Sequence, residues 1–183
     1  MEKIGIFCSA SDSIDNMYFL KTMELGEWMG RHGKTLIYGG ARLGLMECIA
    51  QAAKQAGGNI IAVVPAKLEE KEMVSLLPDQ IIRTKNLSDR KDIILQESEI
   101  MVALPGGIGT LDEAFHVMAA STIGYHSKKI IFYNINGFYN SLLGILDLLY
   151  KNNFARHTLH HYFEVANSFD ELTNLLNKQP QQK

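Results

Sequence analysis

Short, continuous apolar segments alternate along the chain with longer amphipathic ones, and this alternation constrains the fold more than any other feature. The apolar segments predict strands at residues 3–9, 35–38, 59–64, 100–103 and 129–133, with a weaker candidate at 80–83. The segments between them predict helices at 17–31, 44–56, 87–97, 110–122, 139–151 and 169–177, three of which end near Gly33, Gly57 and Gly124. Strands with continuous apolar runs are buried on both faces. The pattern therefore predicts an α/β fold with a doubly wound, mainly parallel sheet in a three-layer sandwich.

Length, composition and charge limit the possible classes of protein. The 183 residues, 46% apolar and 21% charged, suffice for a single domain at 1–178, followed by a flexible tail at 179–183. The net charge is −2 and lysines and arginines form no long run, so we expect no nucleic-acid partner. Neither a signal-peptide pattern nor a membrane-spanning apolar run is present, which favours a cytoplasmic protein without membrane contact. Cys8 and Cys48 lie in apolar contexts, where buried free thiols are expected.

The residues that follow the predicted strands are the first candidates for a site, because doubly wound sheets bind ligands outside the carboxyl ends of their strands. Cys8 and Ser9 open a run of small residues after the first strand, where hydroxyls can accept a phosphate or sugar or small side chains can permit a tight turn. The sequence YGGARLGLM at 38–46 follows the second strand. Its glycine spacing differs from G-x-G-x-x-G, so we expect no NAD there, and close packing of a strand on a helix is the alternative role for Gly40.

The sequence LPGGIGTLDE at 104–113 lies between an apolar segment and a helical pattern. Free N–H groups at a helix start attract anions, and glycines let a phosphate approach the backbone closely. Thr110 and Glu113 also satisfy the T-x-x-E pattern of a capping box, in which both side chains serve the helix alone. The sequence leaves both interpretations open, since a capped helix can also bind a phosphate.

Arg90 is the second candidate for a functional residue. The sequence NLSDRKDIILQES at 86–98 predicts a helix with Arg90 and Lys91 in its first turn, where positive charges oppose the helix dipole. A 3.6-residue period places Leu87, Arg90 and Ile94 on one inward face. A buried guanidinium needs an anionic partner, so we expect Arg90 to pair with a carboxylate such as Glu113, or with an anionic ligand that bridges the two.

In this order and at these separations, YGGARLGLM, the DRK at 89–91 and PGGIGTLDE resemble the LOG (Lonely Guy) family, and the similarity runs from the first strand to about Asn153. The resemblance implies a Rossmann-like fold, a homodimer and no cofactor. It also implies a nucleoside 5′-monophosphate phosphoribohydrolase, which hydrolyses the N-glycosidic bond of an AMP-like or cytokinin ribotide to a free base and ribose 5-phosphate. Met118, Ala119 and Ala120 can pack against a partner helix or within the core.

The resemblance assigns roles to individual residues. Arg90 and Glu113 match the family's catalytic pair, with Arg90 holding the anionic substrate and Glu113 beside the ribose, where a carboxylate stabilises an oxocarbenium-like transition state. The other substrate-binding residues that it implies are Cys8, Ser9, Gly40, Glu72, Lys91, Gly106, Gly107, Ile108, Gly109 and Thr110. The match of Glu72 rests on spacing within a variable loop, where a solvated acid is the alternative.

The chain departs from the family pattern at positions toward the base and the dimer surface. It lacks the histidine that many members have before the Arg-Lys pair, and Ala119, Ala120 and Thr122 replace a threonine, a tryptophan and a glutamine. The phosphate and ribose residues are retained, so the departures put the base preference in question. A non-catalytic nucleotide or molybdenum-cofactor carrier of similar fold is the alternative function.

Two further functions find less support in the sequence. A decarboxylase would need a lysine in a pyridoxal phosphate site, and no lysine has a recognisable setting of that kind. His157, His160 and His161 share one helix face and can form a metal site, but their segment does not follow a strand. We therefore expect no metal.

Overall fold

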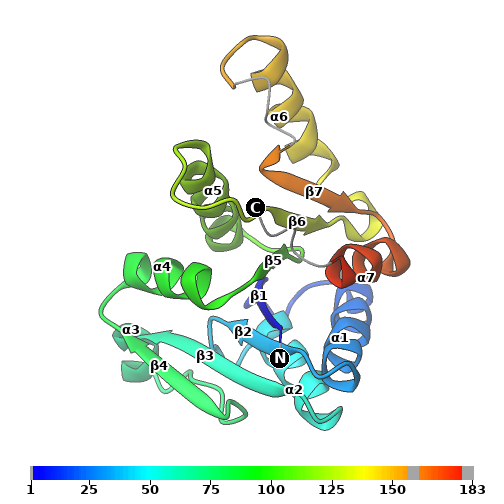
Figure 1. Cartoon of the computed structure of the whole chain (residues 1–183). Helices are drawn as coiled ribbons and strands as arrows, with labels where there is room; N and C mark the ends of the chain where they lie inside the picture. Colours follow the sequence, from blue (N-terminus) through cyan, green and yellow to red (C-terminus); the bar gives the residue numbers. More distant parts are fainter. Residues whose placement is uncertain (1, 156–160, 179–183) are drawn as a thin grey trace.

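A computed structural model describes residues 2–155 and 161–178, which form one parallel sheet with helices on both faces (Figure 1). The predicted fold class, a doubly wound three-layer α/β sandwich, is confirmed. The predicted tail at 179–183 lies outside the described residues, and so do His157 and His160.

Within the described residues the sheet has seven strands. They are β1 (Lys3–Phe7), β2 (Thr35–Tyr38), β3 (Asn59–Pro65), β4 (Gln80–Thr84), β5 (Ile100–Ala103), β6 (Ile130–Tyr133) and β7 (Phe163–Ala166). Their order is β4-β3-β2-β1-β5-β6-β7, and every neighbouring pair is parallel. Strands β1 to β4 follow one another in one direction across the sheet, and β5 lies on the other side of β1. The order therefore reverses between β1 and β5, and such a switch point is where doubly wound folds bind ligands.

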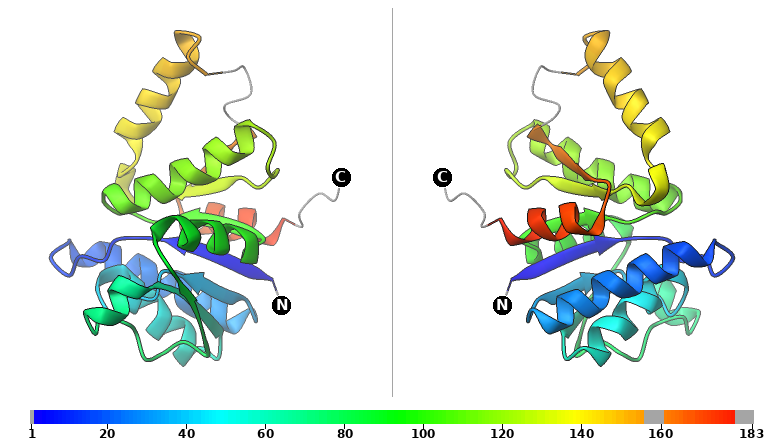
Figure 2. Two further views of the ribbon diagram at one scale, coloured as in Figure 1. Left: turned by 90° about the vertical axis from the view of Figure 1, so that its left-hand side faces the viewer. Right: turned by 90° about the vertical axis from the view of Figure 1, so that its right-hand side faces the viewer.

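Helices cover both faces of this sheet. They are α1 (Asn16–Arg31), α2 (Gly44–Gln55), α3 (Ala66–Glu70), α4 (Leu87–Glu97), α5 (Ile108–Thr122), α6 (Asn140–Lys151) and α7 (Phe169–Asn177), with a 3-10 turn η1 (Ile135–Gly137). One face carries α1, α2 and α7, and the other carries α4, α5 and α6 (Figure 1, Figure 2). Strand side chains alternate between the two layers: Ile4 and Ile6 pack on the α1–α2 side and Phe7 on the α4–α5 side. Both faces are buried, which explains the continuous apolar runs.

The helix ends agree with the sequence, whereas three short elements were missed. Gly33, Gly57 and Gly124 follow α1, α2 and α5 with φ of 62°, 83° and 86°, so the predicted helix ends are confirmed. The missed elements are α3, η1 and β7. Because α3 has no buried residue and β7 is an edge strand of four residues, neither gives a periodic apolar pattern.

Helix α6 projects away from the rest of the molecule (Figure 1). Leu146 is its one buried residue, whereas Ile145 and Leu148 are 54% and 57% exposed. Despite this apolar surface, neither α6 nor any other helix within the described ranges has the length and apolarity to cross a membrane. The exposed side chains of α6 therefore call for another explanation.

Candidate active site

The three predicted junctions meet at the carboxyl edge of the sheet. The Ser9 N–H, after β1, donates to the Pro105 carbonyl, after β5, at 3.2 Å. The Leu45 N–H, in the first turn of α2, donates to the Ser9 carbonyl at 2.9 Å. These bonds join the ends of β1 and β5 to the start of α2, so the candidate segments form one continuous rim around the switch point.

Several residues of this rim are explained by the protein's own packing. Gly40 and Gly44 have φ of 75° and 55°, and a Cβ on either would come within 2.6 Å of Val64 or of the Ala10 backbone. The Ser9 hydroxyl accepts a hydrogen bond from the Ser11 N–H at 3.0 Å, which is a local turn contact. In the structure, Gly40 therefore permits close packing and Ser9 takes part in a tight turn, which are the alternative roles that the sequence left open.

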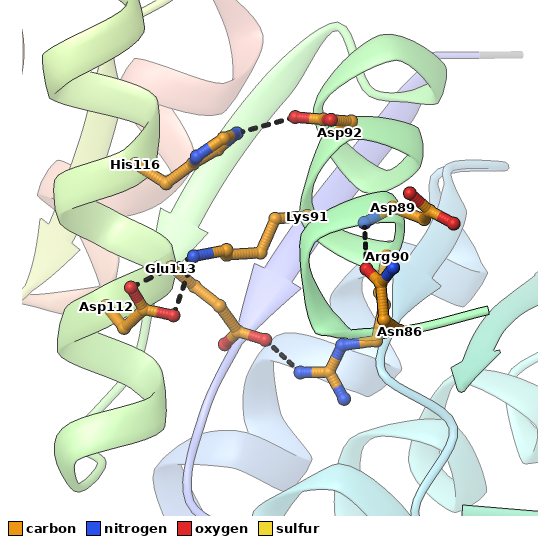
Figure 3. A network of polar contacts seen from close by, with 8 residues as sticks. All are labelled: Asn86, Asp89, Arg90, Lys91, Asp92, Asp112, Glu113 and His116. Atoms are coloured by element: carbon orange, nitrogen blue, oxygen red, sulfur yellow. Dashed lines mark hydrogen bonds and ion pairs between the residues drawn. The ribbon is translucent and has the colours of Figure 1, made fainter. Parts of the chain in front are cut away.

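Arg90 and Glu113 form a buried ion pair at the centre of the rim (Figure 3). Arg90 Nη2 donates to Glu113 Oε1, and the side chains are only 12% and 5% exposed. A Cβ on Gly39 would lie 3.1 Å from Arg90 Nη1, so the guanidinium rests on the end of β2. Arg90 Nε is buried and has no hydrogen-bond partner within the described residues. Arg90 thus faces inward, as predicted, and joins α4 and α5 to the end of β2.

The ionisation of this centre is set by burial. Desolvation raises the pKa of Glu113 above its ordinary value, while the positive charge of Arg90 opposes the shift. Burial also raises the pKa of the Cys8 thiol, and the nearby Glu113 carboxylate adds to that effect. Cys8 therefore lies beside the pair as a neutral thiol, which suits a packing or binding role better than a nucleophilic one.

Two further polar contacts, an ion pair and a histidine–carboxylate contact, join α4 to α5 (Figure 3). Lys91 Nζ lies 3.0 and 2.8 Å from the two carboxylate oxygens of Asp112, and His116 Nε2 lies 3.0 Å from Asp92 Oδ1. The consecutive residues 90, 91 and 92 thus each pair with a residue of α5. Sequence reasoning missed Asp92, Asp112 and His116, although the spacing of 112 and 116 places them one turn apart on α5.

The start of α5 differs from the predicted capping box. The helix begins at Ile108 with Gly107 as its N-cap, so Thr110 lies inside the first turn and caps nothing. Thr110 is buried against Gly106, where a Cβ would lie 2.1 Å from its Oγ1 atom. The capping-box interpretation is therefore wrong, because the glycines let the helix begin two residues earlier and Arg90 takes the Glu113 side chain. The predicted inward face of α4 is also wrong at Leu87, which is 60% exposed in the first turn.

This helix start leaves backbone donors and open space at the rim. The first hydrogen bond closing α5 runs from the Leu111 N–H to the Gly107 carbonyl at 3.1 Å. The N–H groups of 108, 109 and 110 precede it and have no partner within the described residues. A Cβ on Gly107 or Gly109 would meet no atom within 4 Å. Packing therefore does not require glycine at these two positions, whereas a ligand that approaches the backbone would.

The remaining predicted residues lie outside this centre. Glu72 is exposed with φ of 53° and lines a separate shallow pocket of about 380 Å³ beside Arg42. His161 is the described member of the histidine cluster. In residues 2–155 and 161–178, no group of three or more His, Cys, Asp and Glu side chains could hold a metal ion.

Fold and site define the chain as a Rossmann-like α/β protein with a buried Arg–Glu pair at its switch point. A family model described as "Possible lysine decarboxylase" matches residues 46–176. Two Arabidopsis thaliana proteins named cytokinin riboside 5′-monophosphate phosphoribohydrolase are similar over 96% of this chain: one is 30% identical over 77% of its length, the other 32% identical over 82%. The chain therefore belongs to this family, the LOG family, as its motifs predict.

Solved structures support the fold assignment. The molybdenum cofactor carrier protein of Chlamydomonas reinhardtii matches with a TM-score of 0.72 at 23% identity, covering 96% of this chain and 95% of that chain. The molybdenum cofactor binding protein of Rippkaea orientalis matches with a TM-score of 0.69 at 23% identity, covering 96% and 94%. A structural-genomics target matches with a TM-score of 0.75 at 20% identity, covering 96% and 98%. At these identities the likeness shows the fold alone.

The ion pair predicts a pH-dependent loss of stability when Arg90 is removed. Arg90→Met leaves Glu113 buried without a counter-charge, and we expect unfolding free energy to fall by about 3 kcal/mol at pH 8. The pKa of Glu113 then rises further, so the folded protein holds a proton that the unfolded chain has lost. Stability should therefore decline as the pH rises from 5 to 8. Urea denaturation at both pH values measures the effect.

The double variant Arg90→Met/Glu113→Gln is the control for this prediction. It carries no buried charge at the pair. The loss of unfolding free energy that Arg90→Met shows at pH 8 relative to the wild type should therefore be largely restored. A deficit of Arg90→Met that is independent of pH would mean that lost packing, and not the uncompensated Glu113 carboxylate, is its cause.

Proposed function

We propose that the protein is a phosphoribohydrolase, which hydrolyses the N-glycosidic bond of a nucleoside 5′-monophosphate to a free base and ribose 5-phosphate. The observation that carries this proposal is the buried Arg90–Glu113 pair one turn from the open start of α5. The names of the relatives at about 30% identity support it, since they describe this reaction on cytokinin riboside 5′-monophosphates. An AMP-like substrate is the expectation that the family resemblance gives.

The start of α5 would bind the 5′-phosphate. Its N–H groups at 108, 109 and 110, which have no partner in the part of the chain that the structure describes, lie at the positive end of the helix dipole. Gly107 and Gly109 leave room for phosphate oxygens to reach these donors. Binding the phosphate here fixes the ribose near the second turn of the helix, where Glu113 lies.

Glu113 would act on the ribose. As the bond to the base breaks, positive charge develops on the sugar ring, and a carboxylate held next to it stabilises that charge. Glu113 is desolvated, which strengthens this interaction, and its bond to Arg90 fixes its orientation. The same carboxylate can take a proton from the attacking water, because burial raises its pKa toward the working pH.

Arg90 would bind the anionic substrate while holding Glu113. Its Nε is buried and has no partner within the described residues, so this donor would be met only by a group that enters directly beside the pair. Lys91, on the same turn of α4, is bound to Asp112, which balances its charge. The alternative function, a non-catalytic carrier, would use the donors of Arg90 and Lys91 for binding alone.

Removing the Glu113 carboxylate separates the enzyme from a carrier. We expect Glu113→Gln to lower kcat for base release by about 10²- to 10⁴-fold with little change in KM, because the amide cannot accept the proton. Chromatography of free base from a panel of nucleoside 5′-monophosphates measures this, with Glu24→Gln in a surface ion pair as the control. Equal rates in Glu113→Gln would remove the mechanism, and tight binding without release by the wild type would favour a carrier.

Alanine substitutions at two glycines near the start of α5 should have opposite effects on the stability of the fold. Gly109→Ala should leave the free energy of unfolding unchanged or raise it by up to about 1 kcal/mol, since alanine favours a helix. Its methyl group should obstruct the phosphate and raise KM about tenfold. Gly106→Ala is the contrasting variant, which should destabilise the fold because its Cβ meets Thr110. An unchanged KM in Gly109→Ala would mean that the phosphate binds elsewhere.

The protein would act as a homodimer through α5 and α6. The outward face of α5 and the loop after it expose Phe115, Ile123 and Tyr125, the last two by 72% and 81%. Helix α6 lies on the same side of the sheet (Figure 2) and exposes Ile145 and Leu148. An apolar surface of this kind suits a second copy related by a twofold axis. Met118, by contrast, lies in the core and leaves only its neighbours Ala119 and Ala120 near the surface.

Charge placed on this surface should separate the two copies. We expect the wild type to sediment as a dimer and Leu148→Lys to sediment as a monomer with an unchanged circular dichroism spectrum. Leu20→Lys is the matched control, because Leu20 is also exposed, by 54%, but lies on α1 in the opposite layer. A monomeric wild type, or a dimer unaffected by Leu148→Lys, would contradict the assignment.

A further inference from the structure

The start of α6 contacts the loop that leads into the proposed phosphate site. Tyr139, the N-cap residue of α6, donates from its hydroxyl to the Leu104 carbonyl at 2.6 Å. Leu104 directly follows β5, and the two residues lie 35 positions apart in the sequence. Both side chains are buried. A hydroxyl from the segment after β6 therefore holds the backbone of the segment after β5.

The loop from Leu104 to Gly107 needs contacts of this kind to have a defined path. It has no regular secondary structure, and the chain passes from the buried Leu104 to the exposed Gly107 within three residues. Pro105 has no N–H to donate, and the two glycines that follow it permit many backbone conformations. The position of the helix start therefore depends on how the loop is held at its beginning.

Hydrogen bonds hold the beginning of the loop from both sides. The Leu104 N–H donates to the Phe7 carbonyl at 2.9 Å, and the Ser9 N–H donates to the Pro105 carbonyl at 3.2 Å. Both of these bonds join the loop to β1 and the segment after it. Tyr139 follows β6, which is the other neighbour of β5 in the sheet. Its hydroxyl therefore holds the loop from the side opposite to β1.

Asn134, directly after β6, fixes Tyr139 in turn. Its side-chain oxygen accepts the Tyr139 N–H at 2.7 Å, and its amide group donates to the side-chain oxygens of Asn140 and Asn167 at 2.8 and 2.9 Å. Its backbone N–H donates to the Ala166 carbonyl, at the end of β7, at 2.8 Å. Because Asn134 is only 4% exposed, water competes little for these bonds. The backbone of Tyr139 is therefore held in one position.

Packing directs the Tyr139 side chain toward the loop. The centroid of its ring lies 4.9 Å from that of Phe132 in β6 and 5.0 Å from that of Phe138. Burial raises the pKa of Tyr139, so the phenol stays protonated and remains a donor. The ring contacts do not require the hydroxyl, since a phenylalanine ring would fill the same space. The hydroxyl therefore serves the contact with Leu104.

We propose that Tyr139 is a positioning residue for the phosphate site: through the Leu104 carbonyl, it holds the start of α5 in place against the Arg90–Glu113 pair. This inference rests on the proposed function and names a residue that acts through the loop without touching the substrate. When the hydroxyl is removed, the loop keeps its bonds to the β1 side but is released on the β6 side. The N–H groups that begin α5 then hold the phosphate less well.

Tyr139→Phe tests this inference, because it removes one oxygen atom and keeps the ring. We expect KM for a nucleoside 5′-monophosphate to rise by about two- to tenfold, the range that corresponds to one neutral hydrogen bond, with kcat changed by less than about twofold. Titration with ribose 5-phosphate, followed by NMR of the protein, should show the same loss of affinity without any turnover. A tyrosine that only stabilises the fold would change neither KM nor this affinity in the folded protein.

Asn140→Ala is a milder second variant. Asn140 is exposed and supports Tyr139 only through the Asn134 amide, so its loss should raise KM in the same direction but by less. It takes the place of Tyr139→Phe in the test if that variant does not fold, and an unchanged KM would then overturn the inference.

Tyr133→Phe is the matched control. Tyr133 is also a buried tyrosine, 2% exposed, and it ends β6, but it packs in the layer of α1, α2 and α7. The substitution removes a phenol hydroxyl from the opposite face of the sheet and should leave KM and the affinity for ribose 5-phosphate unchanged. An equal rise of KM in both variants would make a general loss of stability the cause and would overturn the inference.

Binding and turnover distinguish this inference from the proposed function. If Tyr139→Phe has the KM and the ribose 5-phosphate affinity of the wild type, the positioning role is wrong and the hydrolase is unaffected. If the wild type releases no base from any nucleotide, but binds ribose 5-phosphate more tightly than Tyr139→Phe does, the positioning role stands and hydrolysis fails. Absence of ribose 5-phosphate binding by the wild type would overturn the phosphate site and the positioning role with it.

Discussion

The buried ion pair between Arg90 and Glu113 is the interaction on which the rest of the site depends. Two charges removed from water are tolerated only when each satisfies the other, so α4 and α5 must meet at the positions that carry them. Lys91 with Asp112 and Asp92 with His116 continue the contact outward to more exposed pairs. The innermost pair is thus held by its neighbours in a fixed geometry, and it lies at the edge of the sheet where parallel strands end.

The strand order explains why a functional centre can form at that edge. Because β5 returns beside β1, the loop after β5 faces the loop after β1, and helices on the two faces diverge from this point. The glycines around it serve two purposes. Gly40, Gly44 and Gly106 relieve internal contacts that a side chain would make too close. Gly107 and Gly109 relieve no such contact, and they keep the backbone accessible.

Sequence reasoning found much of this site from local chemistry. A positive charge in the first turn of a helix is unfavourable, which singled out Arg90, and helical periodicity correctly turned it inward. The same periodicity failed for Leu87, which is 60% exposed although it was expected to share an inward face with Arg90 and Ile94. The capping-box pattern failed because the T-x-x-E spacing does not specify where a helix begins. Gly107 takes the N-cap position, and the Glu113 side chain is then free for Arg90.

The sequence by itself determined the alternation of strands and helices, the parallel sheet, the family and the rim of glycines at the strand ends. These features are encoded within a few residues, through periodicity and helix termini. Only the tertiary structure decided which carboxylate pairs with Arg90, 23 residues away, and that Arg42 lies beside Glu72. It also decided which glycines face open space. Such contacts depend on the path of the chain over the sheet and on the strand order, and no local pattern carries that information.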